Sequence, residues 1–365
     1  MAKRTKEFVE GVDYYFHNGL IVMTEEYHKK RGFCCGGGCK HCPFEPWSQK
    51  GNKNLKTQNK KENVIDAIGT RMKEYYENRF RIMLTRRSNV IIRIDGRCFS
   101  NYTKGLNKPY DTGFMEDMNE TTKYLCENIQ GAKMGYVQSD EISIWLTDYD
   151  DVKTDAWFDY NVQKMCSIAA SMATAKFNQL RMTRAASTYL IDTNGNPHKS
   201  LNLDELNKFK LATFDARCFI LPNQDEVINY FQWRQQDATK NSISMAAETM
   251  YSSTQLLKKN SSDKQELMFQ KGVNWNDYPT RFKRGSSIVR EVEMWIKDKG
   301  AKNKGKRIDA DQAYAAKTAA QLLGMESKHE IYERKNWVID LETPIFSSDK
   351  SFIIKQLGVG TKGNN

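Results

Sequence analysis

The stretch NVIIRIDGRCFSNYTKG, residues 89–105, carries the pattern that decides the fold of this chain. β-branched apolar residues dominate its first half and predict a buried strand over residues 89–95. Asp95 stands where that strand ends, and Gly96 behind it would let a ligand approach the main chain closely. Backbone N–H groups of the next four residues could cradle phosphates: Arg97, Cys98, Phe99 and Ser100. We interpret the stretch as a strand that ends at a ligand site, with an ordinary Asp-Gly turn as the alternative.

The segments that follow place this strand in a recognisable order. Helical spacing of apolar residues predicts helices over about 111–130 and 156–179. Between them, two alternating segments within 133–151 predict a β-hairpin, and residues 212–221 predict a closing strand. The order β-α-β-β-α-β is that of the ferredoxin-like split βαβ unit, so the predicted fold class is α+β.

Three carboxylates fall at significant places in this order. Asp140 and Glu141 lie at the tip of the predicted hairpin, which leads into the third strand. Since the first and third strands of such a sheet are usually neighbours, we expect Asp95 and Asp140 to project at the same end. Hard oxygen ligands select Mg²⁺, and two such ions can clamp both reacting oxygens of a phosphoryl transfer. The alternative is an acidic hairpin tip with no ligand.

Charge and hydropathy narrow the class of protein. The chain has 365 residues and a net charge of +11, and residues 281–308 carry ten Lys or Arg against three acids. Such a stretch favours nucleic-acid binding, although a solvated lysine-rich loop would show the same pattern. No apolar run reaches the length that a membrane helix needs, and the N-terminus lacks the apolar segment of a secretory signal. We therefore expect a cytoplasmic protein without membrane contact.

Four of the eight cysteines are clustered in RGFCCGGGCKHCPF, residues 31–44. Cytoplasmic chains rarely form disulfides, so the cluster predicts a site for zinc or an iron–sulfur centre. His28 or His41 could replace one cysteine, while free thiols or a redox pair are the alternatives. The predicted ligands are Cys34, Cys35, Cys39 and Cys42.

Seven motifs occur together in one order along the chain. They are RIDGRCF, KPYD, YVQSDEIS, WF followed by VQKMCSIAASMATAKFN, FDARCF, YFQWRQQDATKNS and GVNWNDYPTRFKRGS. Through these motifs, the chain from about residue 65 to residue 290 resembles the histidine-tRNA guanylyltransferase superfamily of 3′-to-5′ polymerases, and it is nearest to the Thg-like branch of that superfamily. The resemblance implies a polymerase-type palm on which the 3′-hydroxyl of an incoming nucleoside triphosphate attacks the 5′ end of a tRNA. A 5′-monophosphate end would first be activated by ATP or GTP, and relatives are usually homotetramers.

The resemblance also implies roles for single residues. Asp95, the Gly96 carbonyl and Asp140 would bind two Mg²⁺ ions, while Ser139 and Glu141 would shape the catalytic loop. The residues implied in binding nucleotide or triphosphate, besides those at 96–100, are Lys108, Asp111, Lys164, Asn241 and Lys264. Those implied in meeting tRNA are Lys283 and Arg284, and Arg93 also lies in a matching position.

One departure from the family pattern affects the expected substrate. Enzymes that add guanosine to histidine tRNA carry DCHINN, whereas residues 237–242 read DATKNS. Thr239 stands in place of the histidine, and a hydroxyl cannot replace an imidazole in stacking or in proton transfer near pH 7. This favours template-dependent repair of 5′-truncated tRNA over dedicated guanylylation of histidine tRNA.

Other classes of function stay open from the residues alone. A catalytically inactive RNA-binding module is one, although the intact Asp95 and Asp140 speak against it. A nucleotide cyclase would need a GG[DE]EF hairpin where this chain has QSDEIS. A conventional 5′-to-3′ polymerase would share the metals but extend 3′ ends, and a metal-sensing regulator would use the cysteines.

The composition divides the chain into four segments. They are a Cys-rich module at 1–46, a basic linker at 47–63, the palm-type core at 64–290 and a basic, partly helical extension at 291–365. The first resembles a small bacterial Cys-rich family of unknown function, through the pattern YH..RG.CC followed by C..CP. We expect a helix over about 64–86, another at 309–325 and a strand at 335–341.

Overall fold

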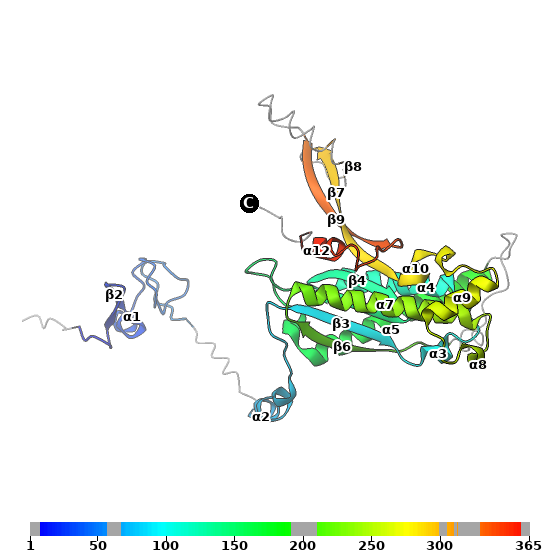
Figure 1. The fold of residues 1–365 in the computed structure, drawn as a ribbon. Helices are drawn as coiled ribbons and strands as arrows, with labels where there is room; N and C mark the ends of the chain where they lie inside the picture. The colour runs from blue at the N-terminus through cyan, green and yellow to red at the C-terminus, as the bar shows by residue number, and fades with distance from the viewer. Residues whose placement is uncertain are drawn as a thin grey trace, which may run out of the picture. The chain divides into compact units, whose positions relative to one another are not determined.

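A computed structural model describes residues 8–56, 67–190, 210–298, 305–309, 312 and 329–358. The chain divides into two compact units, Met1–Phe80 and Arg81–Asn365 (Figure 1). Within the described residues, no helix is both long enough and apolar enough to cross a membrane.

The first unit is small and held together by short-range contacts. Strands β1 (Tyr14–His17) and β2 (Leu20–Met23) pair antiparallel. Helix α1 (Glu25–Arg31) begins after Thr24, whose side chain accepts from the Tyr27 N–H, and it ends at Gly32 in the left-handed conformation. Residues 47–56, predicted as the start of a linker, instead bond back to the Cys-rich loop, where Cys34 N–H donates to the Asn52 carbonyl at 2.8 Å.

The continuous helix predicted over 64–86 is wrong. The structure has a short α2 (Ala67–Tyr75) and a separate 3-10 turn η1 (Glu77–Phe80), while residues 64–66 lie outside the described part of the chain. Beyond them, Leu84 N–H donates to the Tyr160 carbonyl and Val162 N–H to the Ile82 carbonyl. Those bonds require extended backbone at 82–84, so the helical pattern cannot continue there.

The second unit is built on one antiparallel sheet. Its strands are β3 (Asn89–Gly96), β4 (Ala132–Gln138), β5 (Glu141–Leu146), β6 (Phe214–Leu221), β7 (Ser286–Asp298), β8 (Lys306–Ile308) and β9 (His329–Asp340). The spatial order is β6-β3-β5-β4-β7-β8, with β9 on β7. Helix α4 (Thr112–Asn128) joins β3 to β4, and α5 (Val162–Leu190) precedes β6. The predicted order of elements is confirmed, as is the pairing of the first and third strands, β3 and β5.

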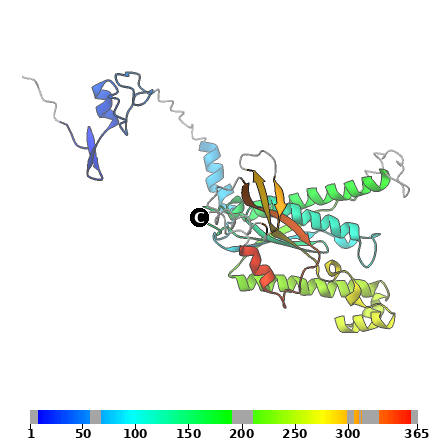
Figure 2. The same ribbon diagram turned by 90° about the horizontal axis from the view of Figure 1, so that it is seen from above.

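Different helices cover the two faces of this sheet (Figure 2), and each face buries its own set of side chains. Alternate residues of β3 at 90, 92 and 94 pack against α4 and α5 in the larger core. Ile91 faces the other way, into a second core with α7 (Gln224–Glu248) and α12 (Ser351–Gly358). Asp95 has the same parity as Ile91, so its side chain belongs to the α7 face.

A group of short helices packs against the far end of α7. It comprises α8 (Ser253–Leu256), α9 (Ser261–Gln270), η3 (Trp275–Asp277) and α10 (Thr280–Arg284). Their shared core contains Ile243 and Ala247 of α7 together with Met268 and Phe282. This group places the basic residues of α10 beside the sheet.

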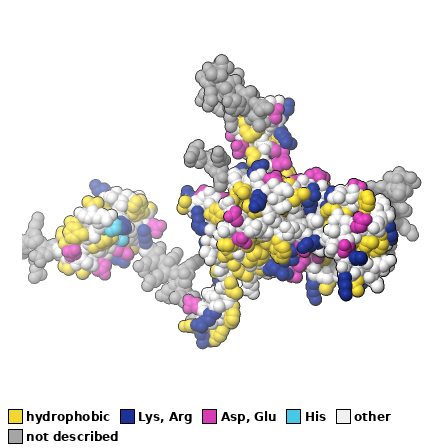
Figure 3. All heavy atoms as spheres, in the orientation of Figure 1, with side chains coloured by type: hydrophobic (Ala, Val, Ile, Leu, Met, Phe, Trp, Pro, Cys, Tyr) yellow, Lys and Arg dark blue, Asp and Glu magenta, His cyan; other side chains and the backbone are white. Residues whose placement is uncertain are grey.

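Strands β7 and β9 form a long hairpin arm that projects from the sheet (Figure 1). The predicted strand at 335–341 lies in β9, which starts earlier, at His329, because it pairs with β7 over its whole length. The helix predicted at 309–325 falls almost wholly outside the described residues. Lys297 is paired with Glu330 and Arg307 with Glu293, so acids offset part of the basic stretch. Basic and acidic side chains are interspersed over the face that Figure 3 shows.

Candidate active site

Asp95 and Asp140 lie together at one end of the sheet, as the sequence predicts. Asp95 pairs in register with Glu141, and Asp140 directly precedes Glu141 in the turn between β4 and β5. Ser139 occupies that turn with φ 49° and donates from its hydroxyl to Asp140 Oδ1 at 3.1 Å. Burial raises the pKa of Asp140 to about 6, and the negative charges of Asp95 and Glu141 add to the effect. The turn therefore holds negative charge in a partly desolvated place.

Glu141 is buried between two guanidinium groups. Arg93 of β3 donates to Glu141 Oε2, and Arg234 of α7 donates from Nη1 to both carboxylate oxygens at 2.8 Å. Arg234 is only 2% exposed and also donates to Asp237 Oδ2 at 2.8 Å. Both carboxylate oxygens of Glu141 thus accept hydrogen bonds from arginines, so this residue holds the turn in place. Arg234 was missed in the sequence, where the spacing of Arg234 and Asp237 in QWRQQD was the available signal.

The packing around residue 96 requires a glycine there, which the sequence alone did not reveal. A Cβ at this position would lie 2.3 Å from the Phe99 ring, so the ring packs directly on the main chain. Phe99 is buried among aromatic rings, with Phe214 and Tyr102 at centroid distances of 5.1 and 4.9 Å. The side chain of Phe99 therefore belongs to the core, and only its backbone could meet a ligand.

The predicted phosphate cradle is incomplete. Arg97 N–H already donates to the Thr213 carbonyl at 2.9 Å, so it is engaged within the fold. Cys98, with φ 58°, turns the chain into the short helix α3 (Phe99–Tyr102). The first N–H groups of a helix have no partner inside it, so Phe99 and Ser100 keep donors that could meet a phosphate.

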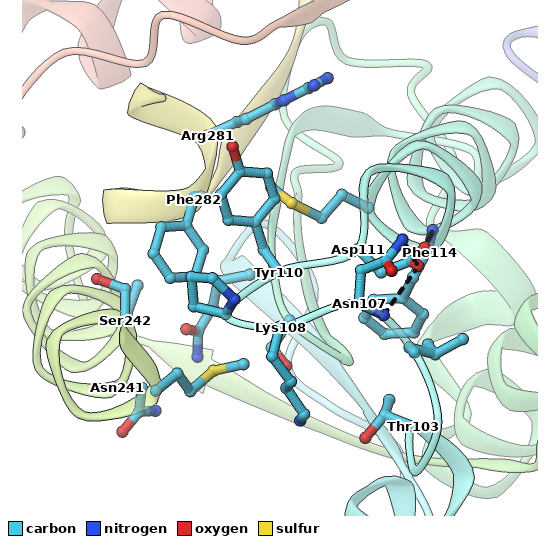
Figure 4. Close-up of a pocket in the computed structure, with 18 residues that line it drawn as sticks. Thr103, Asn107, Lys108, Tyr110, Asp111, Phe114, Asn241, Ser242, Arg281 and Phe282 are labelled. Carbon is cyan, nitrogen blue, oxygen red and sulfur yellow. Dashed lines mark hydrogen bonds between the residues drawn. The ribbon is translucent and has the colours of Figure 1, made fainter. Parts of the chain in front are cut away.

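A pocket opens beside the turn that carries Asp140 (Figure 4). It collects side chains from the loop after α3, from α4, α7 and α10, and from the turn itself. Residues that the sequence assigned to the site and that line this pocket are Lys108, Asp111, Ser139 and Asn241. Arg281 lines it too and was missed, although it stands in the predicted RFKRG motif. Tyr110 and Phe282 supply an aromatic wall, their rings 4.8 Å apart.

Asp111 serves the loop rather than an open ligand site. Its Oδ1 accepts from the Phe114 N–H at 2.8 Å and caps α4, while its Oδ2 accepts from both nitrogens of Asn107. Figure 4 shows these bonds as dashed lines. Asp111 therefore fixes the loop that presents Lys108.

Three more of the predicted cations lie on the group of short helices, on α9 and α10. Lys264 Nζ donates to Ser244 Oγ at 2.8 Å, Lys283 Nζ to the Asn276 carbonyl, and Arg284 Nε to the Thr343 carbonyl at 3.1 Å. Arg284 lines a second groove on another side of α7, together with Thr239 and Trp275. Thr239, the residue that departs from the family pattern, is thus absent from the set that lines the pocket beside Asp140.

The structure does not bring Lys164 to this site, which corrects the prediction. Lys164 lies in the first turn of α5, and its Nζ is 5.1 Å from the Phe158 ring centroid. Asn161, which directly precedes α5, pairs with Met83 in the segment that leads into β3, whereas Asp95 lies near the other end of β3. At about 3.3 Å per strand residue, the two ends of β3 are separated by roughly 20 Å.

The predicted four-cysteine metal site is not supported. Cys35 Sγ and Cys39 Sγ are 3.3 Å apart, and Cys42 Sγ and Cys34 Sγ are 3.6 Å apart, which makes two pairs. In the described ranges, no group of three or more His, Cys, Asp or Glu is arranged to hold a metal ion. His41, an alternative ligand, is hydrogen-bonded through Nε2 to the Tyr15 hydroxyl at 2.8 Å.

Comparisons with known families match both parts of the chain. The sequence model of a family described as tRNAHis guanylyltransferase matches residues 69–222. A family of unknown function matches residues 3–48, which agrees with the resemblance of the Cys-rich module.

Two curated proteins illustrate the more distant relatives. The tRNA(His) guanylyltransferase of Debaryomyces hansenii is 28% identical over 218 residues, covering 56% of this chain and 74% of its own length. Uncharacterized protein R259 of Acanthamoeba polyphaga mimivirus is 28% identical over 252 residues, covering 66% of this chain and 82% of its own length.

Two solved structures are more similar. A bacterial tRNA(His) guanylyltransferase (Thg1)-like protein in complex with ATP is 41% identical, with a TM-score of 0.59, and covers 80% of this chain and 99% of that one. A bacterial protein of the same description in complex with GTP is 39% identical, with a TM-score of 0.57 and the same coverage.

Proposed function

Because the chain belongs to the tRNAHis guanylyltransferase family and is a nucleotidyltransferase that acts on the 5′ end of tRNA, we propose that its reaction is template-dependent repair of 5′-truncated tRNA. In this reaction, each incoming nucleotide is selected by pairing with the opposing strand and is added in the 3′-to-5′ direction. The observation that carries the proposal is the meeting of Asp95 and Asp140 beside a pocket that presents Lys108, Asn241 and Arg281.

The donor set at the carboxylates fits divalent cations. Asp95 and Asp140 offer hard oxygen ligands, and the raised pKa of Asp140 shows that its negative charge is poorly compensated by the protein. Asp95 makes a long ion pair with Arg217, whose Nη2 lies 3.9 Å from Asp95 Oδ2 and whose side chain is more than half exposed. Two Mg²⁺ ions would be held by Asp95, Asp140 and the Gly96 carbonyl, and when bound they would stabilise charge on the attacking and leaving oxygens.

The architecture supports a polymerase-type palm. In the order β6-β3-β5-β4, the strands that carry Asp95 and Glu141 are the central pair, and α4 and α5 cover one face. This is the strand order of a ferredoxin-like sheet. On the α7 face, Asp95 and Asp140 are both partly exposed, so a substrate could reach them.

The chain's own residues bind and orient the nucleotide. Lys108 and Arg281 would neutralise charge on the triphosphate, and Asn241 offers both a donor and an acceptor to a sugar or base. The complexes of two bacterial Thg1-like proteins with ATP and with GTP support nucleoside triphosphates as substrates. Lys283 and Arg284 would meet the tRNA from α10, although their present hydrogen bonds within the fold must then be exchanged.

Thr239 favours repair over dedicated guanylylation of histidine tRNA. It lines the second groove, with the neutral side chains of Gln236 and Ile243, and it places no imidazole there. A site without an imidazole at this position lacks a group for stacking on a base or for proton transfer near pH 7. Selection of the nucleotide is then left to the opposing RNA strand.

The test compares two RNAs in one assay. The protein is incubated with Mg²⁺, ATP and each nucleoside triphosphate, and either a tRNA that lacks its 5′-terminal nucleotide or full-length histidine tRNA. Extension of the truncated tRNA, lost in Asp95→Asn and Asp140→Asn, is expected. Asp225→Asn, an exposed acid in the first turn of α7, is the matched control and keeps activity. Guanosine addition to full-length histidine tRNA alone would replace repair by the dedicated reaction.

A further inference from the structure

The Cys-rich loop of the first unit holds two thiol pairs that nucleotide transfer does not use. Cys35 Sγ and Cys39 Sγ are 3.3 Å apart, and Cys42 Sγ and Cys34 Sγ are 3.6 Å apart. All four are thiols in the structure. The residues proposed for nucleotide transfer belong to the second unit, which starts at Arg81, so these thiols need an explanation of their own.

The two pairs differ in their access to solvent. Cys34 and Cys42 are 1% and 5% exposed and pack against Phe44 in a small core. Cys35 and Cys39 are both partly exposed. A small molecule dissolved in water can therefore reach the pair Cys35 and Cys39 but not the pair Cys34 and Cys42.

The loop between Cys35 and Cys39 is built to bring their sulfurs together. It consists of three glycines, and Gly36 and Gly38 have φ of +79° and +65°, which L side chains rarely adopt. A Cβ at Gly36 would stand 3.1 Å from Lys50 Cβ, so the loop also packs closely on the segment behind it. A disulfide has a sulfur–sulfur bond of about 2.05 Å, so the two thiols need to approach by only roughly 1 Å.

We propose that Cys35 and Cys39 form a thiol–disulfide exchange site whose co-substrate is a small-molecule disulfide of the glutathione class. The Cys35 thiolate attacks one sulfur of that disulfide and expels one small thiolate, leaving a mixed disulfide on Cys35. Cys39 then loses its proton and attacks the Cys35 sulfur, which releases the second small thiol. The protein dithiol is oxidised by two electrons, and the small disulfide is reduced to two thiols.

The surroundings of the two sulfurs agree with this division of roles. The Gly37 N–H and the Cys39 side chain hydrogen-bond to Cys35 and lower the pKa of its thiol, and the positive charge of Arg31 adds to the effect. Burial and the neighbouring Cys35 raise the pKa of the Cys39 thiol. Cys35 is thus the better attacking group, and Cys39 is the group that closes the ring.

The experiment uses the full chain, reduced and then exposed to oxidised glutathione before acid quenching, alkylation and peptide mapping. Trypsin cleaves after Arg31 and Lys40, so Cys34, Cys35 and Cys39 fall on the peptide 32–40 and Cys42 on the next one. A Cys35–Cys39 disulfide leaves the peptide 32–40 with a single alkyl group, located on Cys34, where the reduced peptide carries three, whereas a Cys34–Cys42 disulfide would link two peptides. Treatment of the oxidised protein with dithiothreitol should restore the alkylatable thiols, which tests whether the disulfide forms reversibly.

Matched double variants separate the two pairs. On exposure to oxidised glutathione, the double variant Cys34→Ala with Cys42→Ala should still lose two alkylatable thiols. The double variant Cys35→Ala with Cys39→Ala should keep both of its remaining thiols in this loop. Cys39→Ala alone should accumulate the glutathione adduct on Cys35, which keeps the test decisive even where a buried double variant fails to fold. The proposal is overturned by cross-linked peptides, by an unchanged peptide 32–40, or by one tightly held zinc per chain that blocks alkylation of all four cysteines.

Discussion

Arg234 on α7 donates from Nη1 to both carboxylate oxygens of Glu141 at 2.8 Å, although the two residues are 93 positions apart in the sequence. Both are buried, and Arg93 reaches the same carboxylate from β3. The contact ties the turn that carries Asp140 to the long helix across the sheet. Through it, α7 determines where the catalytic turn stands.

Replacing this arginine should destabilise the fold and disable the site together. In Arg234→Met, Glu141 keeps only Arg93, and loss of one partner from a buried ion pair typically costs about 3–5 kcal/mol. Denaturant unfolding measures this cost, and 5′-extension is assayed at a temperature where the variant is still folded. Arg290→Met, a partly buried cation on the arm, is the control for loss of an arginine. Full activity in folded Arg234→Met would remove the positioning role.

Asp140→Asn should raise stability while it abolishes activity. The Asp140 carboxylate is desolvated and faces Asp95, so a neutral amide of the same shape relieves repulsion. We expect a gain of about 1–2 kcal/mol in the free energy of unfolding near pH 7.5, reduced from the full shift because the group is partly exposed. Thermal unfolding and extension assays on the same preparation check both effects, and a destabilised variant would contradict the account.

The pH dependence follows from the same residue. The pKa of Asp140 is about 6 in the folded chain, and an unfolded aspartate has a pKa of about 3.9. The folded state therefore binds the proton first, so the stabilisation by protonation is complete below about pH 4 and is lost as pH rises through 6. The stability difference between Asp140→Asn and the wild type should shrink as pH falls from 7 to 4. Extension activity should fall below pH 6, because a protonated carboxyl is a poor ligand for Mg²⁺; a flat activity profile from pH 5 to 8 would contradict this.

Gly96→Ala should be costly through packing alone. The added methyl group would meet the Phe99 ring at 2.3 Å, and overpacking of a well-filled core typically costs about 1–3 kcal/mol. Gly358→Ala is the control, since its Cβ meets nothing within 4 Å. Chemical denaturation of both variants gives the comparison. Partial rescue of Gly96→Ala by Phe99→Leu would identify the ring as the cause, and equal stability of the two glycine variants would exclude it.

Two lysines that the sequence treated alike should behave differently. Lys108 lines the pocket beside Ser139, whereas Lys164 lies at the other end of the sheet. We expect Lys108→Met to raise the KM for nucleoside triphosphate about tenfold, the size of one modest charge interaction with phosphate. Lys164→Met should change it less than about twofold. Steady-state kinetics on both variants decide, and a larger effect at Lys164 would refute the placement.

Local pattern predicted the sheet well because burial of one or both strand faces leaves a direct signature. The β-branched run before Asp95 predicted β3 to within one residue, and the predicted hairpin turn lies where β4 ends and β5 begins. Strand β5 ends at Leu146, short of the predicted end of the hairpin at 151. The meeting of Asp95 and Asp140 then followed from topology. Periodicity failed at 64–86, where hydrogen bonds to residues 160 and 162 impose extended chain on a helical pattern.

Contacts between distant segments left less trace in the sequence. The spacing of Arg234 and Asp237 is the one local signal of a paired arginine, and it does not reveal that Arg234 reaches Glu141. The family resemblance placed Lys164 on the helix that covers the sheet. Only the structure shows that the first turn of α5, which carries Lys164, lies at the end of the sheet away from Asp95. Cysteine spacing alone could not tell two thiol pairs from one metal site, because both need the same tight glycine loop.

The most direct test of the repair function varies the template. Four tRNAs that lack the 5′-terminal nucleotide, and that differ only in the base opposite the missing position, are each offered all four nucleoside triphosphates. The account predicts that the added nucleotide changes with the template and is the Watson–Crick complement in every case, with no addition by Asp95→Asn. Addition of guanosine whatever the opposing base would contradict it.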